Sequence, residues 1–149
     1  MKKGFTLVEL MIVMVIVGIL VVIALPKYNE SLERSRALEG INVLKEVSDA
    51  INAQYVLDGN TYKKPSLANI DHSRSKYFSS PAYVSGSSRN IIVERQDAWG
   101  YKLTAENSNG MLDRILCENG PGGDECQIIG ITEAYNGSYA GMFVMDMSN

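Results

Sequence analysis

The chain begins with a long apolar run and continues as an alternation of apolar and polar positions. Between residues 5 and 25, Glu9 is the only charged residue, and no further charge occurs before Pro26. Twenty-one helical residues extend over about 30 Å, the thickness of the hydrocarbon core of a bilayer. Proline removes a backbone donor and clashes with the preceding turn. We therefore expect a membrane-length helix over residues 5–25, with a kink or local unwinding near Pro26.

After Pro26 the pattern becomes amphipathic. Apolar residues recur at steps of three and four, which predicts a helix with one buried face: Ala37, Ile41, Leu44, Val47, Ile51 and Tyr55. The turn formers Asp58, Gly59 and Asn60 end it. Most charged residues between these positions are expected on a solvated face: Glu33, Arg34, Arg36, Glu39, Lys45, Glu46 and Asp49. The sequence thus predicts one helix over residues 5–57, about 80 Å long, whose second half (residues 26–57) packs on a sheet.

The remainder predicts a connection followed by an antiparallel sheet. Residues 58–81 are polar and are expected to hold a short helix near residues 66–70. Alternating segments separated by turn residues predict about four strands, over residues 82–85, 90–95, 101–106 and 112–117. Residues 127–149 are expected to add a strand or an extended tail. The predicted class is α+β, with residues 82–149 as an antiparallel sheet packed on the helix.

The composition limits the classes of function that the chain can have. The chain has 149 residues and a net charge of −3, which favours one domain plus the N-terminal segment. An acidic chain has no overall attraction to nucleic acid or anionic lipid, so no specific nucleic acid is predicted. We find no nucleophile motif, no phosphate-binding loop and no metal-ligand set. We therefore predict no enzyme activity, no catalytic residue, no metal and no cofactor.

The two cysteines, Cys117 and Cys126, bracket eight residues of turn-forming type. Beyond a membrane helix they favour a disulfide in an oxidising compartment, and two free thiols are the alternative. A zinc site would need further ligands that the chain lacks. Glu118, Asp124 and Glu125 could offer oxygens to calcium, although their spacing matches no known loop.

Glu9 is the position in the apolar run that needs an explanation. A cleaved secretory signal has a shorter apolar core and a small-residue cleavage site, and a plain anchor does not need the charge. A local account is available, since Thr6 and Glu9 have the spacing of a capping box. The helix dipole also favours a carboxylate in the first turn.

The segment Lys2-Lys3-Gly4-Phe5-Thr6-Leu7-Val8-Glu9 closely resembles the class III signal of type IV pilins. The resemblance implies a leader of residues 1–4, a cut between Gly4 and Phe5 by prepilin peptidase, and N-methylation of Phe5. It also implies that Glu9 lies beside the charged amino terminus of a neighbouring subunit when helices pack into a fibre. Pairing offsets part of the cost of burying each charge. The resemblance covers about the first thirty residues.

The same resemblance also implies the fold and the roles of other positions. It implies the pilin fold, with a long kinked helix on a sheet, and a segment between Gly18 and Pro26 that can lose helicity in fibres. For Gly18, plain helix packing in the membrane is the alternative. Pilins often close their C-terminal region with one disulfide, which here would join Cys117 to Cys126.

The predicted function is therefore a structural subunit of a type IV pilus, serving adhesion, motility or DNA uptake. Its expected partners are other copies of itself, prepilin peptidase, the inner-membrane assembly machinery and, before assembly, the membrane. Before assembly the protein would be located in the inner membrane, and after assembly it would be part of an extracellular filament. A secretion pseudopilin is one alternative, since Asp97-Ala98-Trp99-Gly100 resembles a pseudopilin stretch apart from Ala98, which replaces a proline. A non-polymerising membrane-anchored binding module is the other.

Overall fold

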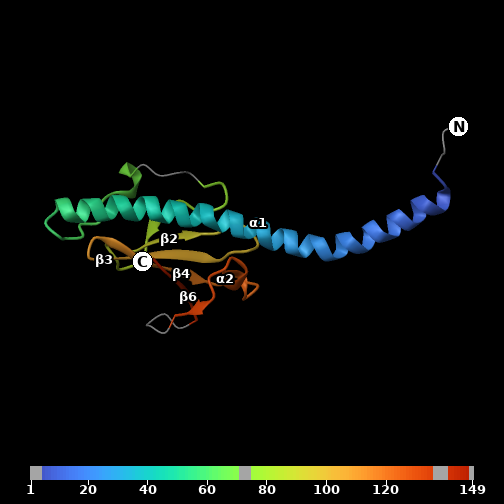
Figure 1. Cartoon of the computed structure of the whole chain (residues 1–149). Coiled ribbons are helices and arrows are strands. Elements are labelled where there is room, and N and C mark those ends of the chain that lie inside the picture. Colours follow the sequence, from blue (N-terminus) through green and yellow to red (C-terminus); the bar gives the residue numbers. More distant parts are fainter. Residues whose placement is uncertain (1–4, 71–74, 136–140, 148–149) are drawn as a thin grey trace.

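One helix, α1 (Leu7–Leu57), runs through the whole molecule. The structure is a computed structural model that describes residues 5–70, 75–135 and 141–147. The first half of α1 projects alone, and its second half lies along the sheet (Figure 1). The predicted helix is confirmed to within two residues at its start, and the α+β class is confirmed.

Both ends of α1 follow from local chemistry. Thr6 is the N-cap, and its hydroxyl oxygen accepts the backbone N–H of Glu9 at 3.3 Å. After Leu57 the chain turns through Gly59 and Asn60, both in the left-handed region. Pro26 lies inside the helix, and Figure 1 shows α1 bent but unbroken there. Of the two expected outcomes near Pro26, a kink or local unwinding, the structure shows a bend without unwinding, because one missing backbone bond can be accommodated by a bend.

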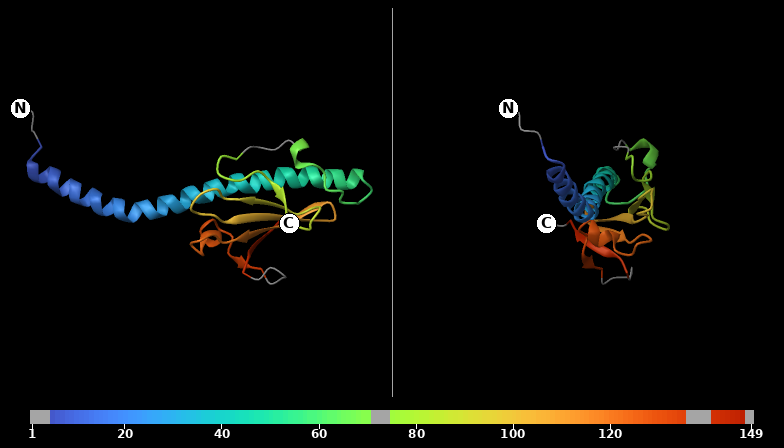
Figure 2. Two further views of the ribbon diagram at one scale, coloured as in Figure 1. Left: turned by 180° about the vertical axis from the view of Figure 1, so that it is seen from behind. Right: turned by 90° about the vertical axis from the view of Figure 1, so that its right-hand side faces the viewer.

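Within the described residues the sheet has six antiparallel strands in the order β1-β2-β3-β4-β6-β5. Their bounds are β1 Ala82–Tyr83, β2 Ile91–Glu94, β3 Lys102–Ser108, β4 Met111–Glu118, β5 Glu133–Ala134 and β6 Phe143–Asp146. The first four match the predicted meander. The strands β6 and β5 widen the sheet beyond it, so the tail after residue 127 returns to pair with β4 (Figure 2).

In the part of the connections that the structure describes there are two short helices. A 3-10 turn, η1 (Leu67–Asn69), occupies the predicted position within the polar connection. The second, α2 (Glu125–Ile128), begins at the last residue of the loop expected between the cysteines and extends into the segment expected as a strand or tail. It lies beside α1, and the Arg34 Nε donates to the carbonyl of Ile128 at 2.6 Å.

The core forms between the second half of α1 and one face of the sheet. Leu44, Val47 and Ile51 from the predicted apolar stripe are fully buried. They meet β3, whose residues alternate between buried and half-buried, with Leu103 and Ala105 directed inward. This alternation is typical of a strand with one covered face.

The disulfide between Cys117 and Cys126 is present, and both residues are fully buried. Hydrogen bonds between residues of the enclosed loop stabilise it. The Asn119 amide accepts from the Cys126 N–H and donates to the Gly123 carbonyl. Gly120 is required here, because a Cβ on it would lie 1.8 Å from the carbonyl oxygen of Trp99.

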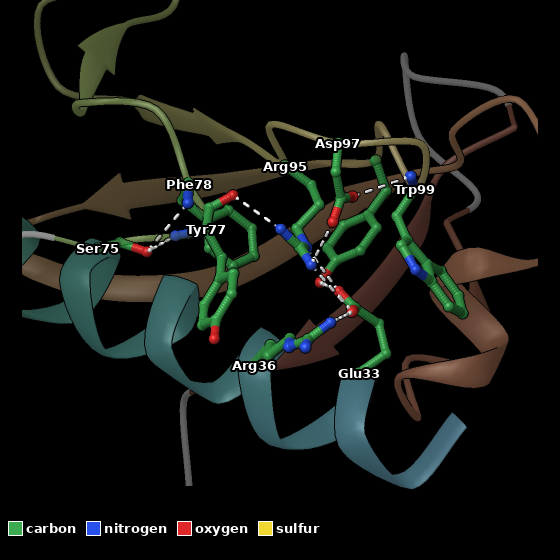
Figure 3. Close-up of polar contacts among 9 residues, drawn as sticks. Glu33, Arg36, Ser75, Tyr77, Phe78, Arg95, Asp97 and Trp99 are labelled. Carbon is green, nitrogen blue, oxygen red and sulfur yellow. Dashed lines mark hydrogen bonds and ion pairs between the residues drawn. The ribbon is translucent and has the colours of Figure 1, made fainter. Parts of the chain in front are cut away.

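Where α1 meets the sheet, the carboxylate of Glu33 is buried in an ion pair. Arg95, which follows β2, donates from Nε to Glu33 Oε1 at 2.6 Å and from Nη2 to Oε2 at 3.1 Å (Figure 3). The side chains of both residues are 1% exposed. The expectation that Glu33 lies on a solvated face is therefore wrong. Its carboxylate is accommodated because a bidentate guanidinium neutralises it.

Further groups complete this cluster. The Tyr101 hydroxyl donates to Glu33 Oε1 at 3.1 Å, and Arg95 also bonds the Tyr77 carbonyl and the Asp97 carboxylate. Burial and the negative charge of Glu33 raise the pKa of Tyr101 above its ordinary value. Burial acts to lower the pKa of Arg95, but the bonds and charge of Glu33 outweigh this and raise it. Arg95 thus stays charged, and Tyr101 stays a hydrogen-bond donor.

We expect Glu33→Ala to lower the free energy of unfolding by about 3–5 kcal/mol, because it removes the bidentate, buried partner of the Arg95 guanidinium and leaves only the partly exposed Asp97 carboxylate beside it. The control is Glu30→Ala, which breaks only the exposed pair with Lys27 and should cost about 1 kcal/mol or less. Thermal unfolding of the full chain in detergent, followed by near-ultraviolet circular dichroism, measures both. Equal losses in the two variants would contradict the structural role of the buried pair.

We expect replacement of both Cys117 and Cys126 by serine to lower the free energy of unfolding by roughly 2.5–3 kcal/mol, the chain-entropy value for a loop of about ten residues. Because both sulfurs are buried, a mild reductant should reduce the native protein slowly and the denatured protein quickly. Thiol labelling against time, with and without denaturant, measures this difference. Rapid reduction of the native protein would contradict the burial of the bond.

Candidate functional site

The first half of α1 is an apolar surface that nothing in the described chain covers. Its most apolar window of 18 residues is 0% buried, and Phe5 is 89% exposed. Leaving such side chains in water costs roughly 1.5–3 kcal/mol each. By length and composition this helix could cross a membrane. The surface must therefore be covered by lipid or by other protein chains.

Glu9 lies in the first turn of this helix, and it forms the reciprocal hydrogen bonds of a capping box with Thr6. Its Oε2 accepts from the Thr6 N–H at 2.8 Å and from the Thr6 hydroxyl at 2.8 Å. The local explanation from the sequence is thus realised in the structure. Both bonds use the same carboxylate oxygen, however, and an ionised carboxylate can accept about four hydrogen bonds. Capping by Glu9 and pairing with an external cation are therefore compatible.

Gly18 lies in the middle of the uncovered helix. A Cβ built on it would meet nothing within 4 Å, so the single chain gives no steric reason for a glycine. Small residues let a second helix approach closely. Pro26 lies near the end of the uncovered half, on the N-terminal side of the buried Glu33. The structure therefore places Phe5, Glu9, Gly18 and Pro26 along one projecting rod rather than around a pocket.

Two predicted features, the cleavage position and the disulfide, are not part of the projecting helix. The cleavage position precedes Phe5, and Gly4 is outside the described residues. The disulfide joins Cys117 in β4 to Cys126 in α2 and is therefore part of the sheet domain.

The acidic residues near the disulfide form no cation site in the described part of the chain. Glu125 turns inward, and its two oxygens accept the backbone N–H groups of Gly122 and Gly123 at 2.6 and 2.9 Å. No group of three potential metal ligands occurs among the described residues. The carboxylate of Glu125 stabilises its own loop.

Sequence reasoning missed the cluster around Glu33, which fixes the angle between the projecting helix and the sheet. One signal was available. Glu33 precedes Ala37 by four positions, so it continues the buried stripe toward the N-terminus. A charge at a stripe position indicates a buried partner, but the partner itself lies 62 positions further along the chain.

Comparisons with known proteins agree with this geometry. Residues 1–25 match the family model described as the prokaryotic N-terminal methylation motif. The chain is 32% identical over 148 residues to a type IV major fimbrial protein FimA of Dichelobacter nodosus, covering 93% of this chain and 86% of that protein. A FimA of Dichelobacter nodosus strain VCS1703A is 30% identical over 148 residues, covering 93% of this chain and 85% of that protein. No solved structure matches.

Over a shorter stretch the identity to a relative is higher. Another FimA of Dichelobacter nodosus is 54% identical over 43 residues, which is 29% of this chain and 27% of that protein. The family model covers only the N-terminal segment, whereas the first relative aligns along nearly the whole chain. The resemblance to type IV pilins is thus confirmed over both the projecting helix and the sheet domain, and the chain belongs to the type IV pilin family.

Proposed function

We propose that the chain is processed at its leader, held in the inner membrane by α1, and then polymerised into a surface filament through the uncovered half of that helix. The single observation that carries this proposal is the apolar half of α1, which has no cover within the described chain. Lipid can cover it in the precursor, and the same surface of other copies can cover it in the filament. The exchange costs little because both surroundings are apolar.

Processing would prepare the N-terminus for this exchange. The cut between Gly4 and Phe5 removes Lys2 and Lys3, which are the only cationic side chains before Glu9. It creates a new ammonium group at Phe5, which the peptidase would methylate. That group on one copy would pair with the Glu9 carboxylate of its neighbour inside the filament. Each charge alone would be costly in an apolar bundle, so the pairing favours a defined register.

The domain after residue 33 would form the outer layer of the filament. Its core and its disulfide are complete within one chain, so it does not need the polymer in order to fold. The filament would serve adhesion, motility or DNA uptake, as in related pili.

We expect Glu9→Gln to reach the membrane at the wild-type level and to form at least about tenfold fewer filaments, because glutamine can still cap the helix but cannot neutralise an ammonium group. The matched control is Thr6→Ala, which removes the N-cap and keeps the charge. It should still form filaments. Electron microscopy of sheared filaments beside a blot of the membrane fraction measures both variants.

Filaments at the wild-type level in Glu9→Gln, together with their loss in Thr6→Ala, would show that Glu9 acts as a cap and would contradict the charge pairing. Absence of the wild-type protein from filaments would instead favour the membrane-anchored binding module.

A further inference from the structure

The end of the domain opposite the projecting half of α1 carries a basic surface. The connection that follows α1 meets the β1–β2 turn and the β3–β4 turn there (Figure 1). The exposed cations on this surface include Lys63, Lys64 and Arg89, here called the distal cations. Because this end points away from the projecting half, neither lipid nor helices around that half would cover it.

The charges of the chain are unevenly distributed along its sequence. Residues 58–95 contain six basic and three acidic residues, whereas residues 96–149 contain two basic and eight acidic residues. Lys63 pairs with Asp58 at 3.1 Å, but within the described part of the chain neither of the other two distal cations forms an ion pair. Those two cations are therefore able to bind an anion from outside the chain.

Lys64 has an unusual backbone conformation. Its φ of +55° lies in the left-handed region, which side chains rarely adopt, and a following proline favours an extended residue instead. Tyr83 in β1 contacts this segment twice. Its hydroxyl donates to the Pro65 carbonyl at 2.9 Å, and its ring centre lies 5.1 Å from Lys64 Nζ. The Lys64 ammonium group is therefore held beside β1.

Arg89 is positioned through both its backbone and its side chain. Its carbonyl accepts the Nδ2 of the buried Asn107 at 2.7 Å, and its guanidinium carbon lies 5.8 Å from the centre of the Tyr62 ring. That ring is itself fixed, since it packs on Tyr55 at 4.3 Å and its hydroxyl donates to Asn52. A positioned cation loses little conformational freedom when it binds a ligand.

Arg89 also lines a polar hollow of about 300 Å³ formed by residues 84–90. Ser87 Oγ accepts backbone N–H groups within the turn, whereas the hydroxyls of Ser85 and Ser88 form no hydrogen bond with the described residues. A guanidinium can bind a carboxylate through two parallel hydrogen bonds, and a hydroxyl both donates and accepts. The hollow thus offers groups that match the carboxylate and the hydroxyls of an acidic sugar.

We propose that this hollow and the distal cations bind an acidic polysaccharide, with Arg89 pairing with the carboxylate of one uronic acid and Lys64 with that of a neighbouring sugar. The site belongs to the folded domain and not to the projecting helix. It goes beyond the proposed polymerisation and adds a ligand class to the proposed adhesive role.

Nucleic acid is the other polyanion to consider, and two observations disfavour it. Single strands stack their bases on aromatic rings, but the Tyr62 ring already contacts Tyr55 and Arg89. Duplex DNA carries one charge per about 1.7 Å, so the acidic residues within residues 96–149 would repel it strongly. A polysaccharide with a single carboxylate on each sugar has a lower charge density.

Titration of the purified full chain in detergent with a hexamer of galacturonic acid tests this site. We expect the hexamer to bind, and its methyl-esterified form, which lacks the charges, to bind at least about tenfold more weakly. Arg89→Gln should weaken binding of the hexamer at least about tenfold, and Lys64→Gln about threefold. Both variants keep the backbone hydrogen bonds, and near-ultraviolet circular dichroism with an intact disulfide confirms their folding.

The matched control is Arg114→Gln. Arg114 also lies beside a tyrosine ring, at 5.7 Å from the centre of Tyr135, but it is paired with Asp113 and Glu106. This variant should keep the affinity for the hexamer within about twofold of wild type.

Three results would overturn the proposal: no binding of the hexamer, equal binding of its methyl ester, or equal losses in Arg89→Gln and Arg114→Gln. Tighter binding of duplex DNA that is lost in Arg89→Gln would overturn it in favour of nucleic acid. Because the purified chain is titrated, each of these results leaves the proposed polymerisation intact, and a failure to form filaments leaves this site intact.

Discussion

The structure depends on one constraint: the first half of α1 is apolar on every side and has no cover within the described chain. Helices of this kind are stable only in lipid or among other apolar helices. The features of this half fit both surroundings. It carries one charge, placed at the helix end where the dipole favours a carboxylate, and a glycine whose Cβ position is open. The rest of the chain is a domain with its own core and disulfide, attached to this rod.

The attachment is made by the ion pair of Glu33 and Arg95. Glu33 is the first buried residue of α1, so the pair marks the point at which the rod becomes part of the domain. Its bidentate bonds and the donor from Tyr101 fix the angle of α1 to the sheet in addition to apolar packing.

Local patterns predicted most of the fold, because they depend on nearby residues. The apolar run and the three-four spacing predicted α1, and short apolar segments bounded by turn residues predicted β1 to β4. The loop between the cysteines predicted the disulfide. Long-range contacts were not predictable in the same way. The partner of Glu33 is remote in sequence, and β5 has only two residues, too few to show alternation.

The candidate site was predictable for a different reason. Its residues lie within the first twenty-six positions, and their roles come from a motif with a fixed spacing. The structure added what the motif does not contain. Glu9 caps its own helix through one oxygen, so capping and an external partner need not compete.

The most direct test of the account measures whether other copies cover the apolar half of α1. A single added cysteine at Val13, exposed in the isolated chain, is compared with one at Ser85 in the exposed turn after β1. In sheared filaments washed free of membrane, the account predicts that a water-soluble maleimide labels the variant Ser85→Cys and leaves Val13→Cys unlabelled until the filaments are dissociated. Equal labelling of both cysteines in intact filaments would contradict it.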